Sequence, residues 1–274
     1  MTGSANACAV RSGKVLLFGY YGCGNVGDDL LLAVLLDKLL ASASNVRVKC
    51  LLAPDSPRDS RVTFLELEKI LADRSRRAPI RLGLFLMQIW KALCGVQVLI
   101  FGGGTLFHAK DGSPTNLLIL ASVVLLARLR GAGVAAIGVG VAEIRGLVPR
   151  ALLSAILRLS KDFAVRDRSS LKNCRGLGGS DKVRLTADLV FLYSLQNRMP
   201  VDHPHPTVGL ALAASAIGDN AGSLLAPVYG FVDRLHERRW DVVGLSFQEL
   251  EFEEIRLSDS ATLQNVRGDR KSVV

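Results

Sequence analysis

Several features that mark other protein classes are scarce in this sequence. Aromatic residues make up 6% of its 274 residues, so its core must consist mostly of Leu, Val, Ala and Ile. The apolar stretches 82–90 and 117–127 are well short of the ~20 residues that a membrane-spanning helix needs. The first residues, MTGSANACAVRSGK, lack the apolar core of a secretory signal. We therefore expect a cytoplasmic protein.

Cysteine pairs are missing as well. The five cysteines are widely spaced, and no CxxC pair occurs among them. A zinc site or a disulfide framework would need a regular cysteine spacing, so neither is indicated. We expect reduced cysteines and no metal site.

Positive charge is abundant but scattered. The formal net charge is +9 and the sequence pI is about 9.6. A nucleic-acid-binding protein also needs clustered cations and aromatic rings that stack on bases, and this chain has few aromatics among its Arg and Lys residues. Contact with an anionic membrane surface, or capture of an anionic small substrate, explains the charge better.

An alternation of apolar strands, loops and helices runs through most of the chain, which is 49% hydrophobic. The order of these elements predicts an α/β fold with a doubly wound, Rossmann-like parallel sheet. Strands are expected at 14–19, 46–52, 96–101, 134–139, 163–166, 183–187 and 190–193, and helices at 29–41, 62–74, 80–93, 117–130, 149–159 and 169–175.

A polar, proline-rich segment, QNRMPVDHPHP, divides the chain. We predict an N-terminal Rossmann-like domain at 1–195, a linker at 196–206 and a partial second α/β domain with a polar C-terminal tail at 207–274. The second domain opens with a strand at 207–213, a helix at 225–238 and a strand at 240–245. About 60 residues are too few for a doubly wound domain, which usually needs ~100 or more. We therefore expect a truncated chain, or a second lobe that is borrowed or vestigial.

The first glycine-rich loop follows the strand 14–19 and contains Gly22, Gly24, Asn25, Gly27 and Asp28. Its glycines let the backbone approach a ligand, and the next helix presents unpaired N–H groups. The spacing lacks the ribose-binding acid of a dinucleotide site, and no GK[ST] ending follows. The loop is therefore either part of a ligand-binding cleft or a tight turn without a ligand.

The second and third loops also follow strands. In GGGTLFHAKDG, consecutive glycines are costly in chain entropy and suit a backbone that touches a ligand; the loop contains Gly102, Gly103, Gly104, Thr105, His108 and Asp111. In AVRDRSSL, Arg166 can grip a carboxylate or phosphate with two parallel hydrogen bonds. Asp167 either orients that guanidinium or caps the next helix, and Ser169 and Ser170 are also natural caps.

Five segments together resemble the polysaccharide pyruvyl transferase family in order and rough spacing. They are GYYGCGNVGDD, IFGGGTLFHAKD, IGVGVAEIRG, AVRDRSSL and LTADLVF. The resemblance implies a two-lobed architecture similar to that of the GT-B glycosyltransferases. It also implies transfer of a pyruvyl group from phosphoenolpyruvate to a sugar, often as a cyclic ketal, in bacterial exopolysaccharide or cell-wall polymer synthesis. No cofactor is implied. The acceptor could be lipid-linked, with the enzyme at the inner face of the cytoplasmic membrane.

The resemblance also suggests roles for single residues. Arg166 matches the arginine of the family's VRD motif and is expected to bind the anionic donor, while His108 and Asp111 are acid–base candidates. The first loop, Gly102–Gly104, Thr105, Asp167 and Ser169 are expected to contact substrate. Asp188 matches the aspartate of the TAD motif, for which a helix cap is the stronger interpretation.

One family feature is missing. The resemblance implies an arginine shortly followed by a histidine near the end of the second lobe. Arg234 and His236 have this spacing, but they lie too early in the chain, on a predicted helix with a charged, solvated face. Two alternatives therefore remain open. The protein could be a glycosyltransferase that uses a nucleotide-sugar donor, or a non-catalytic carbohydrate-binding remnant.

Overall fold

The structure, a computed structural model, describes residues 13–54, 59–109, 112–193, 205–211, 221–245, 249–252 and 255–258. The chain divides into two compact units, one of residues 1–22 and 28–193 and one of residues 23–27 and 194–274. The linker predicted at 196–206 falls mostly outside the described residues, so this boundary stays a prediction.

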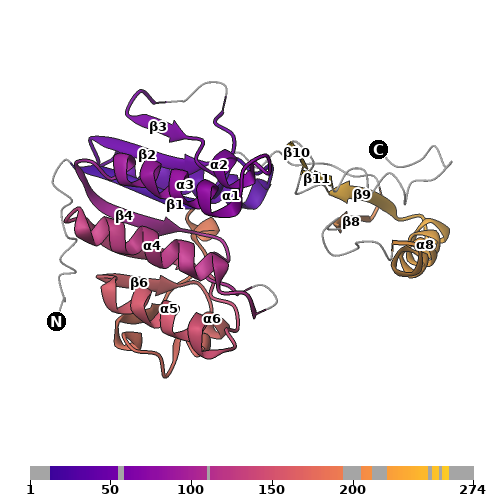
Figure 1. The fold of residues 1–274 in the computed structure, drawn as a ribbon. Coiled ribbons are helices and arrows are strands. Elements are labelled where there is room, and N and C mark those ends of the chain that lie inside the picture. Colours follow the sequence, from indigo (N-terminus) through magenta and orange to yellow (C-terminus); the bar gives the residue numbers. More distant parts are fainter. Residues whose placement is uncertain are drawn as a thin grey trace, which may run out of the picture. The chain divides into compact units, whose positions relative to one another are not determined.

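The first unit is built on a seven-stranded sheet with the order β3-β2-β1-β4-β5-β6-β7. Every neighbouring pair in it is parallel. The chain winds outward from β1 to β3 and then, starting from β4, in the other direction to β7 (Figure 1). This is a doubly wound sheet, so the predicted fold class is confirmed. The strands are β1 (Lys14–Tyr21), β2 (Asn45–Cys50), β3 (Val62–Leu65), β4 (Val96–Gly102), β5 (Gly133–Val139), β6 (Asp162–Val165) and β7 (Val183–Leu185).

Helices cover both faces of this sheet. Buried residues of α3, α4 and α5 form one hydrophobic cluster with one face, and α1 packs in a second cluster on the other face. No helix within the described residues is both long enough and apolar enough to cross a membrane. The helices are α1 (Val26–Leu40), α2 (Glu68–Ala72), α3 (Ala78–Ala92), α4 (Thr115–Leu129), α5 (Leu147–Leu159) and α6 (Arg168–Cys174), with short 3-10 helices η2 (Ser180–Lys182) and η3 (Leu189–Leu192).

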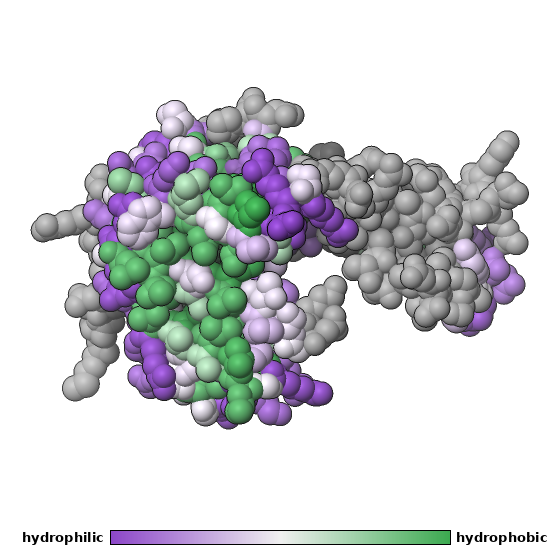
Figure 2. All heavy atoms as spheres, viewed as in Figure 1, coloured by the Kyte–Doolittle hydropathy of each residue, from purple (hydrophilic) through white to green (hydrophobic). Residues whose placement is uncertain are grey.

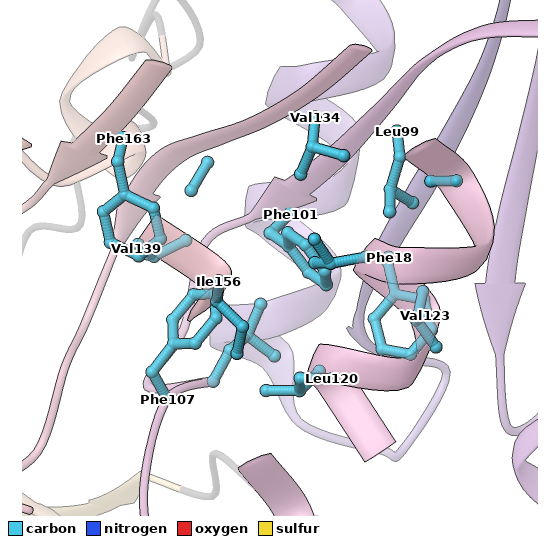
Figure 3. Close-up of a cluster of buried hydrophobic side chains, with 14 of the residues drawn as sticks. Phe18, Leu99, Phe101, Phe107, Leu120, Val123, Val134, Val139, Ile156 and Phe163 are labelled. Atoms are coloured by element: carbon cyan, nitrogen blue, oxygen red, sulfur yellow. The ribbon is translucent and has the colours of Figure 1, made fainter. Parts of the chain in front are cut away.

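Five of the ten phenylalanines of the chain lie in the larger cluster. Phe18, Phe101, Phe107 and Phe163 form a row across the strands (Figure 3). Successive ring centroids lie 5.4, 5.5 and 5.1 Å apart. The first two pairs meet edge to face, the arrangement that aromatic quadrupoles favour. This row ties β1, β4 and β6 together beneath the loops that follow them.

Two predicted elements of this unit are wrong. Residues 62–74 form strand β3 and then helix α2 instead of one amphipathic helix. Val62 pairs in register with Val46 of β2, so tertiary pairing overrides a pattern that also fits a helix. Residues 190–193 do not form a strand, because Asp188 caps the 3-10 helix η3 there.

The second unit contains a short β-α-β segment. Strand β8 (Thr207–Ala211) pairs in parallel with β9 (Asp241–Leu245), and helix α8 (Ala221–Glu237) lies between them in sequence. Arg234 and His236 lie on α8, as the sequence predicted. An antiparallel hairpin of β10 (Glu249–Phe252) and β11 (Ile255–Ser258) follows, in a region that the sequence predicted only as a polar tail.

Loss of one ring from the phenylalanine row should destabilise the first unit. We expect Phe101→Ala to lower the free energy of unfolding by about 3–5 kcal/mol, because it removes buried contacts and leaves a cavity. The control is Phe191→Ala, since the Phe191 side chain is 80% exposed. Urea denaturation of both variants checks this, and equal losses would contradict the assignment of the core.

Candidate functional site

Three segments of the first unit meet at the carboxyl edge of the sheet. Asp28 lies in the first turn of α1, the helix after β1, whereas Thr105 follows β4 and Arg166 follows β6. Strands β1 and β4 are neighbours at the point where the winding direction changes. In open α/β sheets, ligands bind outside the strand ends at such a point, so this edge is the candidate functional site.

Arg166 is the centre of the contacts at this edge. Its Nη1 donates to Oδ2 of Asp188 at 3.2 Å, and its Nη2 donates to Oγ1 of Thr105 at 3.0 Å. Its Nε lies 3.5 Å from Oδ2 of Asp167. The side chain is 30% exposed, so the guanidinium is fixed by neighbours while part of it still faces solvent.

Asp167 fulfils both roles that the sequence left open. It caps helix α6, accepting a hydrogen bond from the Ser170 backbone N–H at 2.7 Å, and it also pairs with Arg166. The Ser170 hydrogen bond is the main cause that lowers the pKa of Asp167, and the Arg166 charge adds to it. Asp167 thus couples the start of α6 to the orientation of the guanidinium.

Asp188 has the predicted capping role and a second one that the sequence did not reveal. Its Oδ1 accepts from the Val190 backbone N–H at 3.1 Å at the start of η3. Its other oxygen holds Arg166. The two residues are 22 positions apart, and only the parallel pairing of β6 with β7 brings their segments together.

Asp28 is the carboxylate with the most unusual electrostatics in the site. Desolvation by burial is the main cause that raises its pKa from 3.8 to about 6. The charges of Asp29 and Asp188 raise the pKa further, and the charge of Arg166 lowers it. Helix α1 begins at Val26, earlier than predicted, so Asp28 lies in its first turn. A carboxyl that titrates near neutral pH can accept or donate a proton during a reaction.

Glycines allow these groups to lie close to the backbone. A Cβ atom on Gly104 would come within 2.8 Å of Oδ1 of Asp28. A Cβ atom on Gly140, which follows β5, would lie 2.8 Å from Oγ1 of Thr105 and 3.3 Å from Nε of Arg166. The glycines of the second loop and of the IGVGV segment therefore have a steric role in the site.

The remaining glycines of the second loop pack against the neighbouring elements. A Cβ atom on Gly102 would meet Leu35 of α1, and one on Gly103 would meet Leu31. The Gly102 carbonyl accepts a 2.6 Å hydrogen bond from the Tyr21 hydroxyl, which is fully buried. Burial is the main cause that raises the pKa of Tyr21. These two glycines let the loop after β4 approach α1 and β1.

The first loop is a sequence of local turns. Gly22 has a positive φ of 68°, and its N–H donates to Oδ1 of Asp29 at 2.9 Å. Gly24 also has a positive φ, of 65°, and the Gly27 N–H donates to Oδ1 of Asn25 at 2.9 Å. Residues 23–27 belong to the second unit. A substrate contact by Gly22, Gly24, Asn25 or Gly27 stays a prediction.

Three other predicted residues are not assigned a role by these contacts. His108 is half-buried, and its carbonyl accepts from Nδ2 of Asn116 at 3.2 Å. Ser169 is exposed in the first turn of α6, whereas its neighbour Ser170 is buried and accepts from the Val141 N–H at 2.9 Å. Asp111 lies outside the described residues. Their catalytic or binding roles stay predictions.

A charge pair between a buried lysine and a half-buried glutamate was not predicted. Lys49 of β2 forms an ion pair with Glu68 of α2 and also donates to the Gly19 carbonyl at 3.3 Å. The pair borders a cavity of about 260 Å³, which is also lined by Tyr20, Ser113 and Thr115. The available signal was Lys49 within the predicted strand 46–52, because a lysine that is buried in a sheet needs a partner.

No metal centre is visible in the part of the chain that the structure describes. Within it, His, Cys, Asp and Glu side chains form no group of three or more that could hold a metal ion. The expected absence of a cofactor stays a prediction.

Substitution of Gly140 should disturb Thr105 and Arg166. We expect Gly140→Ala to lower the free energy of unfolding by about 1–3 kcal/mol, because the added methyl group must displace both side chains. The control is Gly83→Ala in α3, where a Cβ atom meets nothing within 4 Å and helix propensity predicts a gain of up to ~1 kcal/mol. Denaturation curves that show the two variants to be equally stable would contradict this packing.

Replacement of Asp28 should change how stability depends on pH. The folded-state pKa of about 6 lies above the ordinary 3.8, so the folded state holds the proton more tightly. The resulting stabilisation is present below about pH 4 and is lost as pH rises through about 6. Relative to wild type, Asp28→Asn should therefore gain stability between about pH 4 and 7.

Thermal denaturation across this pH range measures the effect. Asp37→Asn, on the same helix, is the control, since the Asp37 carboxylate is exposed beside Lys38. If Asp28→Asn and Asp37→Asn follow the same pH profile, Asp28 does not have the electrostatic environment described above.

Comparisons with known proteins bear on the family and the fold of the chain. A sequence model described as polysaccharide pyruvyl transferase matches residues 25–256. No curated protein is significantly similar to the chain. Among solved structures, the 2.2 Å crystal structure of a putative UDP-N-acetylglucosamine 2-epimerase from Listeria monocytogenes matches with a TM-score of 0.53 and 10% identity. The match covers 96% of this chain and 68% of that one. At this identity it supports only the α/β fold. The family match, which spans most of the chain, identifies it as a member of the polysaccharide pyruvyl transferase family.

Proposed function

We propose that this protein transfers a pyruvyl group from phosphoenolpyruvate to a pair of carbohydrate hydroxyls during bacterial exopolysaccharide or cell-wall polymer synthesis. Family membership supports this class of reaction. The observation that carries the proposal is the Arg166 guanidinium at the end of β6, whose charge is coupled to a carboxyl, Asp28, with a pKa of about 6.

Arg166 is proposed to bind the donor. Phosphoenolpyruvate carries a carboxylate and a phosphate, and a guanidinium can hold either with two parallel hydrogen bonds. Arginine has five N–H donors, and hydrogen bonds to Asp188 and Thr105 use one donor on each terminal nitrogen. Each terminal nitrogen therefore keeps a second N–H for the anionic donor.

Asp28 is proposed to accept a proton from the sugar. One hydroxyl of the acceptor adds to C2 of the enolpyruvyl group and loses its proton, while the methylene carbon gains a proton and becomes a methyl group. A second hydroxyl then forms the other C–O bond at C2 while the C–O bond to phosphate breaks, and its proton goes to the departing phosphate, which leaves as inorganic phosphate. Near pH 7, a carboxyl with a pKa of about 6 is mostly ionised and can act as the base. His108 and Asp111 are the proposed donors of the proton to carbon.

The acceptor is proposed to be a lipid-linked carbohydrate. The enzyme itself is proposed to be cytoplasmic and to work at the inner face of the membrane. The net charge of +9 supports contact with an anionic surface. No nucleic acid is expected as a partner, because the cations are not interleaved with stacking aromatic residues.

Donor binding can be tested without knowing the acceptor. We expect phosphoenolpyruvate to raise the melting temperature of the wild-type protein by mass action. Arg166→Ala should weaken its binding by about 2 kcal/mol, roughly 30-fold in Kd, as measured by calorimetry.

Arg184→Ala is the matched control. Arg184 follows Arg166 on the neighbouring strand β7 and forms a two-bond ion pair with Asp162, at 2.8 and 2.7 Å. This control should bind phosphoenolpyruvate as the wild type does. Equal binding by Arg166→Ala and wild type would overturn the role of Arg166.

The same assay separates the alternatives. The structural neighbour is described as a putative UDP-N-acetylglucosamine 2-epimerase, so UDP-N-acetylglucosamine is the competing ligand to test. A thermal shift with the nucleotide sugar and none with phosphoenolpyruvate would favour a nucleotide-sugar donor. Binding of oligosaccharides without either donor, and no phosphate release from phosphoenolpyruvate with any acceptor, would favour a non-catalytic carbohydrate-binding protein.

A further inference from the structure

The outer face of the helical layer α3–α4–α5 exposes large apolar side chains. Their exposed fractions run from 38% at Trp90 to 88% at Leu147. Figure 2 shows hydrophobic atoms in a broad band down the helical side of the first unit, with hydrophilic atoms along its margins. The exposed apolar residues of this face are Ile80, Met87 and Trp90 of α3, Leu118, Leu125 and Leu129 of α4, and Leu147 and Val148 of α5.

This face is distinct from the core-facing side of the same helices. In α4, Leu117, Leu120, Val123 and Ala127 are fully or almost fully buried. Leu118, Leu125 and Leu129 follow one another at intervals of seven and four residues, which places them on one separate stripe of the helix. An ordinary surface helix has one apolar stripe and a polar outer face, whereas α4 is apolar on both sides.

The charges in these three helices all have the same sign. Within α3, α4 and α5 no residue is acidic, and the charged residues are Arg81, Lys91, Arg128, Arg150 and Arg158. Arg77 and Arg130 stand at the ends of α3 and α4. Helix α1, on the opposite face of the sheet, contains three aspartates. The exposed apolar residues Trp90 and Leu129 therefore have exposed basic neighbours in sequence, Lys91, Arg128 and Arg130.

The basic residues beside Trp90 and Leu129 are exposed, and Arg128 also donates from Nη1 to the Ala132 carbonyl at 3.3 Å. Among the ion pairs of the described residues, none involves Lys91, Arg128 or Arg130. The guanidinium of Arg130 lies over the Trp90 ring, 3.7 Å from its centroid. A tryptophan stacked with a cation presents an apolar ring and a charge side by side, as side chains at a lipid–water interface do.

We propose that the outer face of α3–α4–α5 docks on an anionic phospholipid surface. Leu125, Leu129 and Trp90 enter the headgroup region, and Lys91, Arg128 and Arg130 contact the lipid phosphates. Such a surface satisfies both properties of the face, since interfacial binding combines buried apolar area with attraction to anionic lipid. A second copy of the chain fits less well, because a twofold interface would bring the same cations of both copies together.

Sedimentation with vesicles tests the proposal on the full chain. We expect the protein to bind vesicles of phosphatidylcholine and phosphatidylserine, to bind pure phosphatidylcholine much more weakly, and to lose affinity as salt increases. Arg128→Gln/Arg130→Gln should weaken binding to the anionic vesicles by about fivefold for each cation removed. Leu125→Gln/Leu129→Gln should weaken binding to both kinds of vesicle.

The control is Arg184→Gln/Leu185→Gln, which removes an exposed cation and an exposed leucine from strand β7, away from this face. It should bind vesicles as the wild type does, and melting curves verify that all variants are folded. Equal binding of all variants, or no preference for anionic lipid, overturns the proposal. A third result also overturns the proposal: the protein does not bind vesicles, sedimentation velocity shows that it is a dimer, and Leu125→Gln/Leu129→Gln dissociates this dimer. The proposal extends the membrane location given under the proposed function. None of these results depends on phosphoenolpyruvate, so the transfer reaction and the role of Arg166 are tested separately.

Discussion

The candidate site depends on the way in which Arg166 is held. Its guanidinium joins the loop after β4, through Thr105, to the segment after β7, through Asp188. Asp167 adds a third contact and at the same time fixes the start of α6. Partly buried cations are stable only when neighbouring acceptors compensate for lost hydration. The carboxyl edge of the sheet is therefore organised around one charge.

Glycines near Arg166 leave the space that its guanidinium and the neighbouring side chains occupy. Gly140 leaves room for Thr105 and the guanidinium, and Gly104 leaves room for Asp28. Burial and the negative charges of two other carboxylates raise the pKa of Asp28, and together they outweigh the lowering effect of the Arg166 charge. An anion that binds Arg166 would add negative charge near Asp28 and raise that pKa further. Donor binding and proton transfer are thus electrostatically coupled in the function that we propose.

The sequence predicted the sheet and the strand-end loops but not the contacts within the site. Apolar strands followed by glycines reveal a doubly wound fold from local pattern alone, and Arg166 was recognisable by its position after β6. The short strand Val62–Leu65 was taken as helix because its pattern fits both states until β2 pairs with it. The pairing of Arg166 with Asp188 and the raised pKa of Asp28 depend on distant segments, which no local pattern encodes.

The helical layer and the strand-end site belong to the same sheet, since α3, α4 and α5 cover one face and the loops lie at its carboxyl edge. A face that binds lipid could thus bring the site to a lipid-linked acceptor. A crystal structure of the protein with phosphoenolpyruvate bound tests the role of Arg166 most directly. We expect the carboxylate or phosphate of the ligand within hydrogen-bond distance of the terminal nitrogens of Arg166. Phosphoenolpyruvate bound elsewhere, with Arg166 still engaged only with protein groups, would contradict it.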